Sequence, residues 1–210
     1  MSEQAAKDLG RTVFADRFDL AERYADLLAG EGTTRGLIGP RETERLWSRH
    51  LMNSAGLESA IAEGSTVVDV GSGAGLPGLP LALARPDLEI TLVEPLLRRT
   101  TFLEEVVEEL ELGDRVRVVR GRAEDVAGED FRFDVVTSRA VAALDRLVRW
   151  CAPLMGPRGQ ILAVKGSSAQ EEIDRHRKVL ERVGLSAAVL HLGGRGEVAP
   201  TIAVRLRPTL

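Results

Sequence analysis

The sequence predicts an α/β fold: a Rossmann-like, mostly parallel seven-stranded sheet that ends in an antiparallel hairpin, preceded by helices at the N-terminus. Three observations predict it. Short apolar runs alternate with helical segments from residue 66 to residue 183, a glycine-rich turn follows the first run, and two further apolar runs close the chain. We therefore expect a helical extension in residues 1–60 and the main domain in residues 61–210.

The helical extension is predicted from two amphipathic patterns. Residues 9–28 place apolar side chains at helical spacing, with aspartate and arginine on the other face, and residues 42–53 repeat this spacing. Residues 30–40 contain four glycines and a proline, which predicts a loop between the two helices. The apolar positions of the first helix are Phe14, Phe18, Ala21, Ala25 and Leu28.

Strands and helices then alternate without interruption, which indicates parallel strands with helices on both faces of the sheet. The predicted strands cover residues 66–70, 89–94, 115–120, 133–138 and 159–165. The predicted helices cover residues 76–84, 96–111, 122–127, 143–153 and 168–183.

Two strands at the C-terminal end, residues 186–192 and 199–206, are joined by a short glycine-rich run. Because the connection is short, we expect an antiparallel pair at the edge of the sheet. Five parallel strands followed by such a hairpin form the outline of the class I methyltransferase fold, whereas dinucleotide-dependent dehydrogenases usually lack this ending.

The turn after the first strand predicts a nucleotide-cofactor site. Residues 66–78 read TVVDVGSGAGLPG, an apolar run followed by an acid and four glycines. Gly71 and Gly73 allow the backbone to turn sharply and to approach a ligand where a Cβ would collide. The helix predicted for residues 76–84 begins at this turn, so we expect its first N–H groups to point at the ligand.

Two acidic residues bear on which cofactor binds. Asp69 lies just before the turn, where a carboxylate would repel the pyrophosphate of a dinucleotide but stabilise the ammonium group of S-adenosylmethionine. Glu94 ends the second strand, where it is placed to accept hydrogen bonds from the ribose hydroxyls of either cofactor. An NAD-linked oxidoreductase stays open as an alternative, because Gly73, Gly75 and Gly78 match the spacing of the dinucleotide fingerprint.

Composition excludes several other classes of protein. The net charge of −4 is not that of a protein coated in basic residues, so any contact with nucleic acid must be local. Cys151 is the single cysteine, which excludes an internal disulfide and a cysteine-based zinc site, and no other spacing predicts a metal site. No segment is typical of a signal peptide or a membrane span, so we expect a cytoplasmic protein, and we expect it to be a monomer.

Basic residues gather near the predicted site. Arginines and one lysine predominate between residues 139 and 165, and Arg98 and Arg99 follow the second strand closely, so the two groups can collect phosphates beside the cofactor. Arg139 and Lys165 each end a strand, where doubly wound sheets bind ligands, and they are the candidates for catalytic side chains. The alternative interpretation is a set of solvated helix faces and a solvated strand-end lysine.

The absence of certain motifs reduces the number of atoms that could accept a methyl group. Methyltransferases that modify exocyclic amino groups commonly carry an Asn/Asp-Pro-Pro-aromatic turn after the fourth strand, and residues 133–140 contain none. Cytosine C5 methylation needs a cysteine nucleophile, but Cys151 lies in an apolar stretch that predicts a buried thiol. Guanine N7 has a lone pair and no proton, so its methylation requires no general base. Another RNA or a small molecule as the substrate, or an RNA-binding module without catalysis, remain alternatives.

Five motifs, taken in order, carry a resemblance to a known family. They are Arg49-His50-Leu51 with Asn53-Ser54, DVGSGAGLPGLP at residues 69–80, Arg98-Arg99, Ser138-Arg139-Ala140 and Val164-Lys165-Gly166. As a set they resemble the RsmG (GidB) family, which uses S-adenosylmethionine to methylate guanine N7 in the decoding-region hairpin of bacterial 16S ribosomal RNA.

The resemblance implies the partners and the site residues. The partner would be small-subunit ribosomal RNA or its ribonucleoprotein particle, and the strong bias of arginine over lysine indicates a GC-rich bacterium such as an actinobacterium. By resemblance, the cofactor contacts fall on Gly71, Leu76, Ala123, Glu124 and Arg139, in addition to Asp69, Gly73 and Glu94. We expect contacts with RNA at Arg49, His50, Arg98, Arg99 and Lys165. For His50, which lies on an amphipathic helix, a packed and hydrogen-bonded structural role is the alternative.

Overall fold

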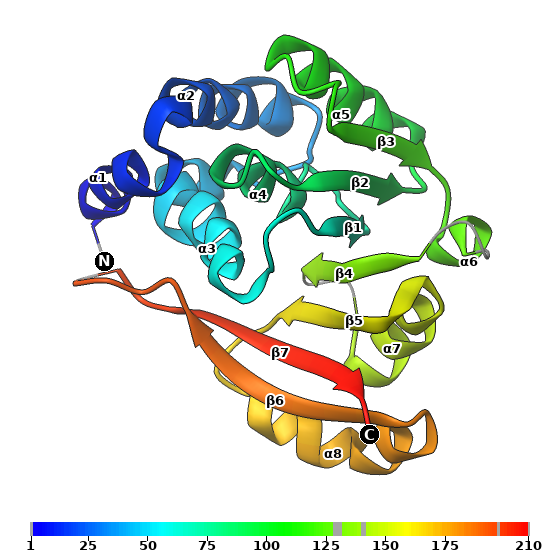
Figure 1. The fold of residues 1–210 in the computed structure, drawn as a ribbon. Coiled ribbons are helices and arrows are strands. Elements are labelled where there is room, and N and C mark those ends of the chain that lie inside the picture. Colours follow the sequence, from blue (N-terminus) through cyan, green and yellow to red (C-terminus); the bar gives the residue numbers. More distant parts are fainter. Residues whose placement is uncertain (1, 128–131, 140–141, 197, 210) are drawn as a thin grey trace.

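A seven-stranded sheet forms the centre of the protein, with strand order β3-β2-β1-β4-β5-β7-β6 (Figure 1). The computed structural model describes residues 2–127, 132–139, 142–196 and 198–209. Strands β1 to β5 are parallel, while β7 lies antiparallel between β5 and β6, as the predicted fold class requires. The strands are β1 Thr66–Val70, β2 Glu89–Glu94, β3 Val116–Arg120, β4 Phe133–Arg139, β5 Met155–Val164, β6 Leu185–Leu192 and β7 Thr201–Pro208.

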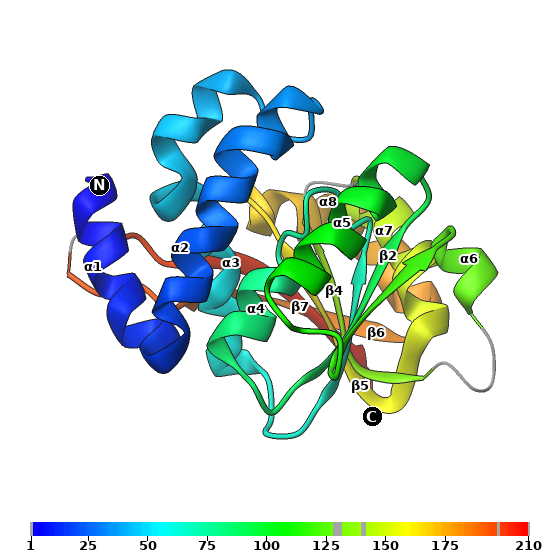
Figure 2. The same cartoon turned by 90° about the horizontal axis from the view of Figure 1, so that it is seen from above.

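Helices cover both faces of the sheet (Figure 2). The N-terminal helices pack with α4 (Gly78–Ala84) and α5 (Leu97–Glu109) on one face, and α6 (Ala123–Val126), α7 (Leu144–Cys151) and α8 (Ala169–Arg182) pack on the other. The pleat of β1 divides its side chains between two cores, since Val67 belongs to the first and Val68 and Val70 to the second. A central strand that is buried on both faces is mainly apolar, which explains the three valines of β1, and Asp69 is the exception.

The fifth strand begins earlier than the sequence predicts. Strand β5 starts at Met155 rather than at residue 159, because Met155 pairs with Phe133 before the register shifts at Val135. This irregularity interrupts the pattern from which the strand was predicted.

The predicted helix over residues 9–28 is not continuous. The chain forms α1 (Glu3–Phe14), a 3₁₀ turn (Ala15–Arg17), α2 (Phe18–Leu27) and a π-helical turn (Leu28–Gly32). The break falls at Ala15, whose φ of 46° cannot continue a right-handed helix. Residues 42–53 are also helical but irregular. They lie in a 3₁₀ helix (Pro40–Arg45), a π-helix (Leu46–Leu51) and α3 (Met52–Ala55), which a further 3₁₀ helix (Gly56–Ala60) follows.

Trp47 explains the break between α1 and α2. Its ring stacks on Phe18 with centroids 5.3 Å apart and meets Phe14 edge-on at 6.3 Å. Because the chain turns at Ala15, the last residue of α1 and the first residue of α2 both reach this ring. All three aromatic side chains are buried in the core that also contains Val67 of the sheet. The N-terminal helices thus share a core with the main sheet, and a domain boundary at residue 60 stays a prediction.

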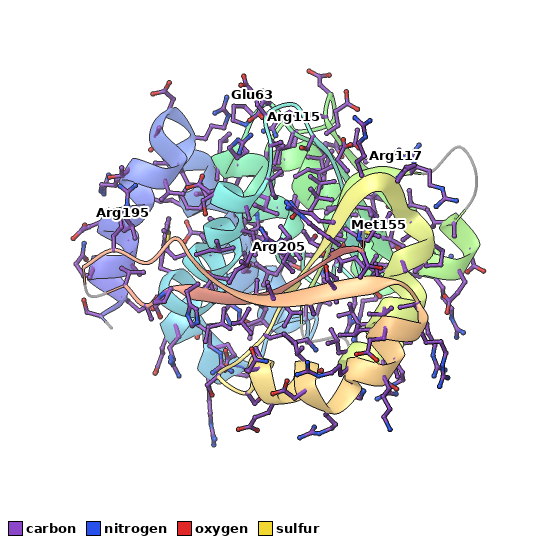
Figure 3. All side chains as sticks on the ribbon, turned by 60° about the horizontal axis from the view of Figure 1, so that its bottom comes forward. Glu63, Arg115, Arg117, Met155, Arg195 and Arg205 are labelled. Carbon is purple, nitrogen blue, oxygen red and sulfur yellow. The ribbon has the colours of Figure 1, made fainter. Side chains whose placement is uncertain are left out.

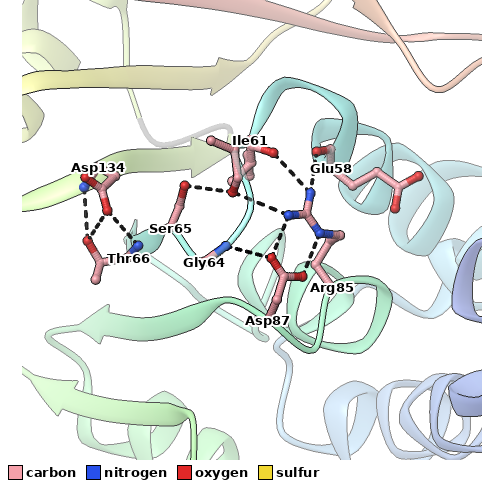
Figure 4. A network of polar contacts seen from close by, with 9 residues as sticks. Glu58, Ile61, Gly64, Ser65, Thr66, Arg85, Asp87 and Asp134 are labelled. Carbon is pink, nitrogen blue, oxygen red and sulfur yellow. Dashed lines mark hydrogen bonds and ion pairs between the residues drawn. The ribbon is translucent and has the colours of Figure 1, made fainter.

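A polar network fastens the end of the N-terminal segment to the sheet (Figure 4). Arg85 donates to the carbonyl oxygens of Glu58 and Ile61 and pairs with Asp87, whose carboxylate also accepts from the backbone N–H of Gly64. The Arg85 guanidinium lowers the pKa of Asp87 well below its ordinary value. This network lies at the amino ends of β1 and β2, whereas the glycine-rich turn lies at the carboxyl end of β1.

Charged side chains lie mainly at the surface. The exposed residues Glu63, Arg117 and Arg195 mark three separate parts of the periphery in Figure 3. Within the described part of the chain, no helix combines the length and the apolar character that crossing a membrane requires.

Asp69 lies inside the fold and holds the first residues after β1 in place. Its fully buried carboxylate accepts hydrogen bonds from the backbone N–H of Gly78, at 3.1 Å, and from the Thr137 hydroxyl of β4, at 3.3 Å. Gly78 packs so closely on Leu92 and Asp69 that a Cβ there would overlap both. The expectation that the first N–H groups of this helix point at a ligand is therefore wrong for Gly78, because Asp69 takes its hydrogen bond.

We expect Trp47→Ala to lower the free energy of unfolding by about 3–5 kcal/mol, because it removes a buried indole from between two aromatic rings. Urea denaturation monitored by circular dichroism measures the change. Leu97→Ala is the control, since Leu97 is 58% exposed and its truncation should change the stability little. A loss below about 1 kcal/mol at Trp47 would show that the N-terminal helices are not part of the cooperative core.

We also expect Asp69 to make the stability depend on pH. Burial raises its pKa from 3.8 to about 7, so between these values the folded protein keeps a proton that the unfolded chain has released. The stability should therefore fall as the pH rises through this window. Asp69→Asn should lack this part of the dependence, which amounts to ~1.4 kcal/mol per pH unit at most. Urea titrations of both proteins across the window measure it, and parallel pH profiles would contradict the prediction.

Candidate functional site

A cavity of about 1400 Å³ opens at the carboxyl ends of the parallel strands, where doubly wound sheets bind their ligands. Its floor comes from the turn after β1, the connections that follow β2 and β3, and the ends of β4 and β5. A further wall comes from residues between Leu37 and Asn53, which lie in the N-terminal segment. The sequence indicated the floor, but of this wall it indicated only Arg49 and His50.

The turn after β1 is held from both sides. The backbone N–H groups of Gly71 and Ser72 donate to the carbonyl oxygen of Val93 in β2, at 2.9 and 3.1 Å. From the N-terminal segment, the buried Tyr24 hydroxyl donates to the carbonyl oxygen of Ala74 at 2.8 Å. Gly71 and Gly73 line the cavity, as predicted for residues that let a ligand approach the backbone. The contact with Tyr24 was not predicted, since an aromatic residue on an amphipathic helix carries no mark of such a partner.

Glu94 lies at the end of β2, almost fully buried, and lines the cavity. Its two carboxylate oxygens accept from the backbone N–H groups of Gly73 and Leu96, each at 3.0 Å. Arg99 approaches the same carboxylate at 3.5 Å. Each carboxylate oxygen can accept more than one hydrogen bond, so Glu94 both shapes the turn and retains capacity for a ribose hydroxyl.

Three further residues that the resemblance assigned to the cofactor lie in the cavity wall. Leu76 belongs to the turn after β1, and Ala123 and Glu124 begin α6, next to the end of β3. The structure therefore brings them to the same cavity as Gly71 and Glu94. Direct contacts with a cofactor stay predictions for each of them.

Arg139, the last residue of β4, carries a half-buried guanidinium in the cavity wall. Among the described residues it donates to two neutral acceptors, Nδ1 of His50 at 2.7 Å and the carbonyl oxygen of Arg49 at 3.4 Å. Burial lowers its pKa from the ordinary value, although arginine stays protonated. A half-buried cation whose hydrogen bonds go to neutral acceptors favours an anionic ligand.

His50 lines the cavity but is engaged within the protein, and its predicted contact with RNA stays a prediction. The ring is buried, and in addition to the bond from Arg139 its Nε2 lies 2.9 Å from a carboxylate oxygen of Glu42. Burial, and then the charge of Arg139, lower the pKa of His50 to about 4. Arg49, by contrast, is 54% exposed at the cavity and pairs with the same carboxylate. Glu42 was not recognised from the sequence.

Lys165 lies at the end of β5 and lines the cavity, but its ammonium group is engaged within the protein. It donates to the carbonyl oxygen of Ala142 at 3.0 Å and pairs with Glu172 at 2.8 Å, and its side chain is 12% exposed. Glu172 also accepts from the backbone N–H of Leu144 at 2.7 Å. This arrangement holds the start of α7, and a catalytic or RNA-binding role for Lys165 stays a prediction.

The remaining predicted residues lie apart from the cavity. Arg98 is exposed on α5 but is not in the cavity wall, and Asp69 is buried beneath the turn rather than facing the cavity. Cys151 is buried in α7, as predicted, and burial raises the pKa of its thiol to about 12. Ala140 of the Ser-Arg-Ala motif lies outside the described residues. Among those residues, no group of three or more His, Cys, Asp or Glu side chains is arranged to hold a metal ion.

These positions fit S-adenosylmethionine better than a dinucleotide. A pyrophosphate would bind at the start of α4, but the Asp69 carboxylate occupies the N–H of Gly78 there. S-adenosylmethionine carries a ribose and an amino-acid carboxylate, and the cavity is lined by a carboxylate, Glu94, and a guanidinium, Arg139, whose chemistry suits these two groups. The buried carboxylate of Asp69 does not line this cavity, and its predicted contact with the ammonium group stays a prediction.

Two solved methyltransferases have a similar fold. The chain superposes on mitomycin 7-O-methyltransferase MmcR with a TM-score of 0.62 and 20% identity, covering 91% of this chain and 63% of the other. It superposes on TYW2 of M. jannaschii, solved in complex with AdoMet, with a TM-score of 0.59 and 18% identity, covering 78% of each chain. These identities are low, so they confirm the predicted methyltransferase fold and nothing finer.

Sequence comparison identifies the family. The model of GidB, described as rRNA small subunit methyltransferase G, matches residues 17–196. The ribosomal RNA small subunit methyltransferase G of Salinispora arenicola is 59% identical over 199 residues, which cover 92% of this chain and 82% of the relative. The protein of the same name from Nocardioides sp. is 60% identical over 201 residues, which cover 95% and 80%. The predicted resemblance is thereby confirmed, and the chain belongs to the GidB family of small-subunit ribosomal RNA methyltransferases.

Proposed function

We propose that the protein transfers a methyl group from S-adenosylmethionine to N7 of a guanine in the decoding-region hairpin of bacterial 16S ribosomal RNA. Its family makes it a ribosomal RNA methyltransferase that depends on S-adenosylmethionine. The observation that carries the proposal is the cavity, where Glu94 and the guanidinium of Arg139 lie beside the turn after β1. An NAD-linked oxidoreductase is not supported, because the backbone N–H of Gly78, which a pyrophosphate would need at the start of α4, already donates to Asp69.

The residues around the cavity suit a reaction that needs no general base. S-adenosylmethionine, when bound, supplies an electrophilic methyl carbon on a sulfonium. Guanine N7 offers a lone pair and loses no proton, so the protein has only to align donor and acceptor. His50 is bonded at both ring nitrogens, and Cys151 is buried away from the cavity. Neither residue is placed to remove a proton or to form a covalent intermediate.

Roles for individual residues follow from their places in the cavity. We assign Glu94 to the ribose hydroxyls and Arg139 to the amino-acid carboxylate of the cofactor. Gly71 and Gly73 leave room for the methionine part beside the turn. Ala123 and Glu124, at the start of α6, flank the place of the adenine.

Exposed cations at the rim are suited to RNA phosphates. Arg49 and Arg45 extend from the N-terminal wall, and Arg122 lies across the cavity before α6. Arg98 is exposed at the start of α5 and stays a predicted RNA contact, as does the less exposed Arg99. Cations on both sides of one opening would hold a polynucleotide across it. The substrate is ribosomal RNA, and we propose a cytoplasmic, monomeric enzyme.

We expect the protein to form 7-methylguanosine when it is incubated with labelled S-adenosylmethionine and small-subunit RNA that lacks the modification. Parallel reactions with naked 16S RNA and with isolated small-subunit particles show which form is the substrate. Digestion to nucleosides followed by chromatography identifies the product. Label in any other nucleoside would overturn the assignment of N7.

We expect Arg139→Gln to bind S-adenosylhomocysteine about 10–100-fold more weakly than the wild type, since it removes a charge-assisted hydrogen bond to the carboxylate. Isothermal titration calorimetry measures the affinity. Arg158→Gln is the matched control, because Arg158 is exposed at a separate, smaller cavity lined also by Asp134. Equal affinity in wild type and Arg139→Gln would remove Arg139 from the cofactor site.

A further inference from the structure

Three side chains form a continuous line of hydrogen bonds from the N-terminal segment to the cofactor cavity. Glu42 contacts Nε2 of His50 at 2.9 Å, and Nδ1 of His50 contacts the guanidinium of Arg139 at 2.7 Å. Glu42 and His50 come from the wall of the cavity, and Arg139 ends β4 in its floor. The last bond joins residues 89 positions apart in the chain.

The partners of His50 determine its tautomer. A guanidinium has donors and no acceptor, so Nδ1 of His50 must accept the bond from Arg139. The proton of the neutral ring therefore lies on Nε2, which donates to the carboxylate of Glu42. The ring stays neutral at ordinary pH, because burial and the charges of Arg139 and Arg49 lower its pKa to about 4 against the opposing effect of Glu42. A protonated ring would lose its acceptor and repel Arg139.

The backbone around His50 is held independently of Arg139. The π-helix Leu46–Leu51 begins at backbone N–H groups that need partners, and the carboxylate of Glu3 accepts from Trp47 and Ser48 at 2.9 and 3.0 Å. The same π-helix directs the carbonyl oxygen of Arg49 toward the guanidinium of Arg139. The carbonyl oxygen of Arg49 and Nδ1 of His50, two acceptors from consecutive residues, thus both accept from the guanidinium of Arg139.

We propose that His50 is a positioning residue, which together with the carbonyl oxygen of Arg49 fixes the guanidinium of Arg139 for the cofactor. An arginine side chain has many rotamers, and a fixed acceptor removes the entropy that binding would otherwise cost. Glu42 keeps the ring in the tautomer that accepts. His50 therefore acts through Arg139 and does not itself contact RNA. This inference rests on the proposed function, in which Arg139 binds the carboxylate of the cofactor.

The test compares two substitutions of His50 by calorimetry with S-adenosylhomocysteine. His50→Phe keeps a ring but removes both nitrogens, and it should weaken binding about tenfold or more. His50→Asn places an amide oxygen near the position of Nδ1, and it should bind within about threefold of the wild type. His191→Asn, which changes an exposed histidine of β6, should bind as the wild type does. Melting curves establish that each variant is folded.

Nuclear magnetic resonance of the histidine ring nitrogens gives a second readout, independent of the cofactor. The wild type should carry the His50 proton on Nε2, and Arg139→Gln should shift the Nδ1 resonance. A proton on Nδ1 would overturn the proposal even if His50→Phe does not fold. Equal affinity of the wild type and a folded His50→Phe would also overturn it. A wild type that binds no S-adenosylhomocysteine would instead contradict the proposed function.

Discussion

The buried carboxylate of Asp69 is the interaction on which the architecture of the site depends. It joins the end of β1 to the start of α4 through Gly78 and to β4 through Thr137. The residues between Asp69 and Gly78 must therefore form a tight turn, and this turn provides Gly71 and Gly73 to the cavity. An acid in a central strand opposes burial, and hydrogen bonds from a helix start and a hydroxyl offset that cost. The same bond that shapes the turn also removes a binding place for pyrophosphate.

The N-terminal helices belong to the active site as much as to the core. Tyr24 supports the turn after β1, and the segment from Leu37 to Asn53 closes one side of the cavity. The packing of Trp47 against α1 and α2 keeps this segment on the sheet. In the proposed assignments, one short segment serves both RNA and the cofactor, because the exposed Arg49 lies next to His50, which is bonded to Arg139.

Six of the seven strands could be predicted to within two residues at each end, while the start of β5 and much of the cavity wall could not. Strands β1 and β2 have the predicted bounds, since a buried parallel strand is a short apolar run between turn residues. The break at Ala15 and the π-helix at Leu46 lie around the buried Trp47. Packing of this kind joins distant residues, so it produces no pattern in the local sequence. Glu42 and Tyr24 were missed because their partners are not visible in the local sequence. Glu42 bonds the buried ring of His50, and Tyr24 bonds the backbone oxygen of Ala74, 50 positions away. The sequence singles out Asp69 as an acid in an apolar strand. Spacing alone could not show whether its carboxylate faces the cavity or the interior beneath the turn.

The π-helix at Leu46–Leu51 makes the length of this segment part of the site. Its hydrogen bonds span five residues instead of four, so it holds one residue more than an α-helical turn would. Deleting a single residue there would remove the wider turn and move His50 relative to the backbone N–H groups that Glu3 holds. The hydrophobic character of the segment would hardly change, yet the imidazole and the guanidinium would no longer meet. Chain length between Pro40 and Asn53 is consequently a constraint on sequence change in its own right.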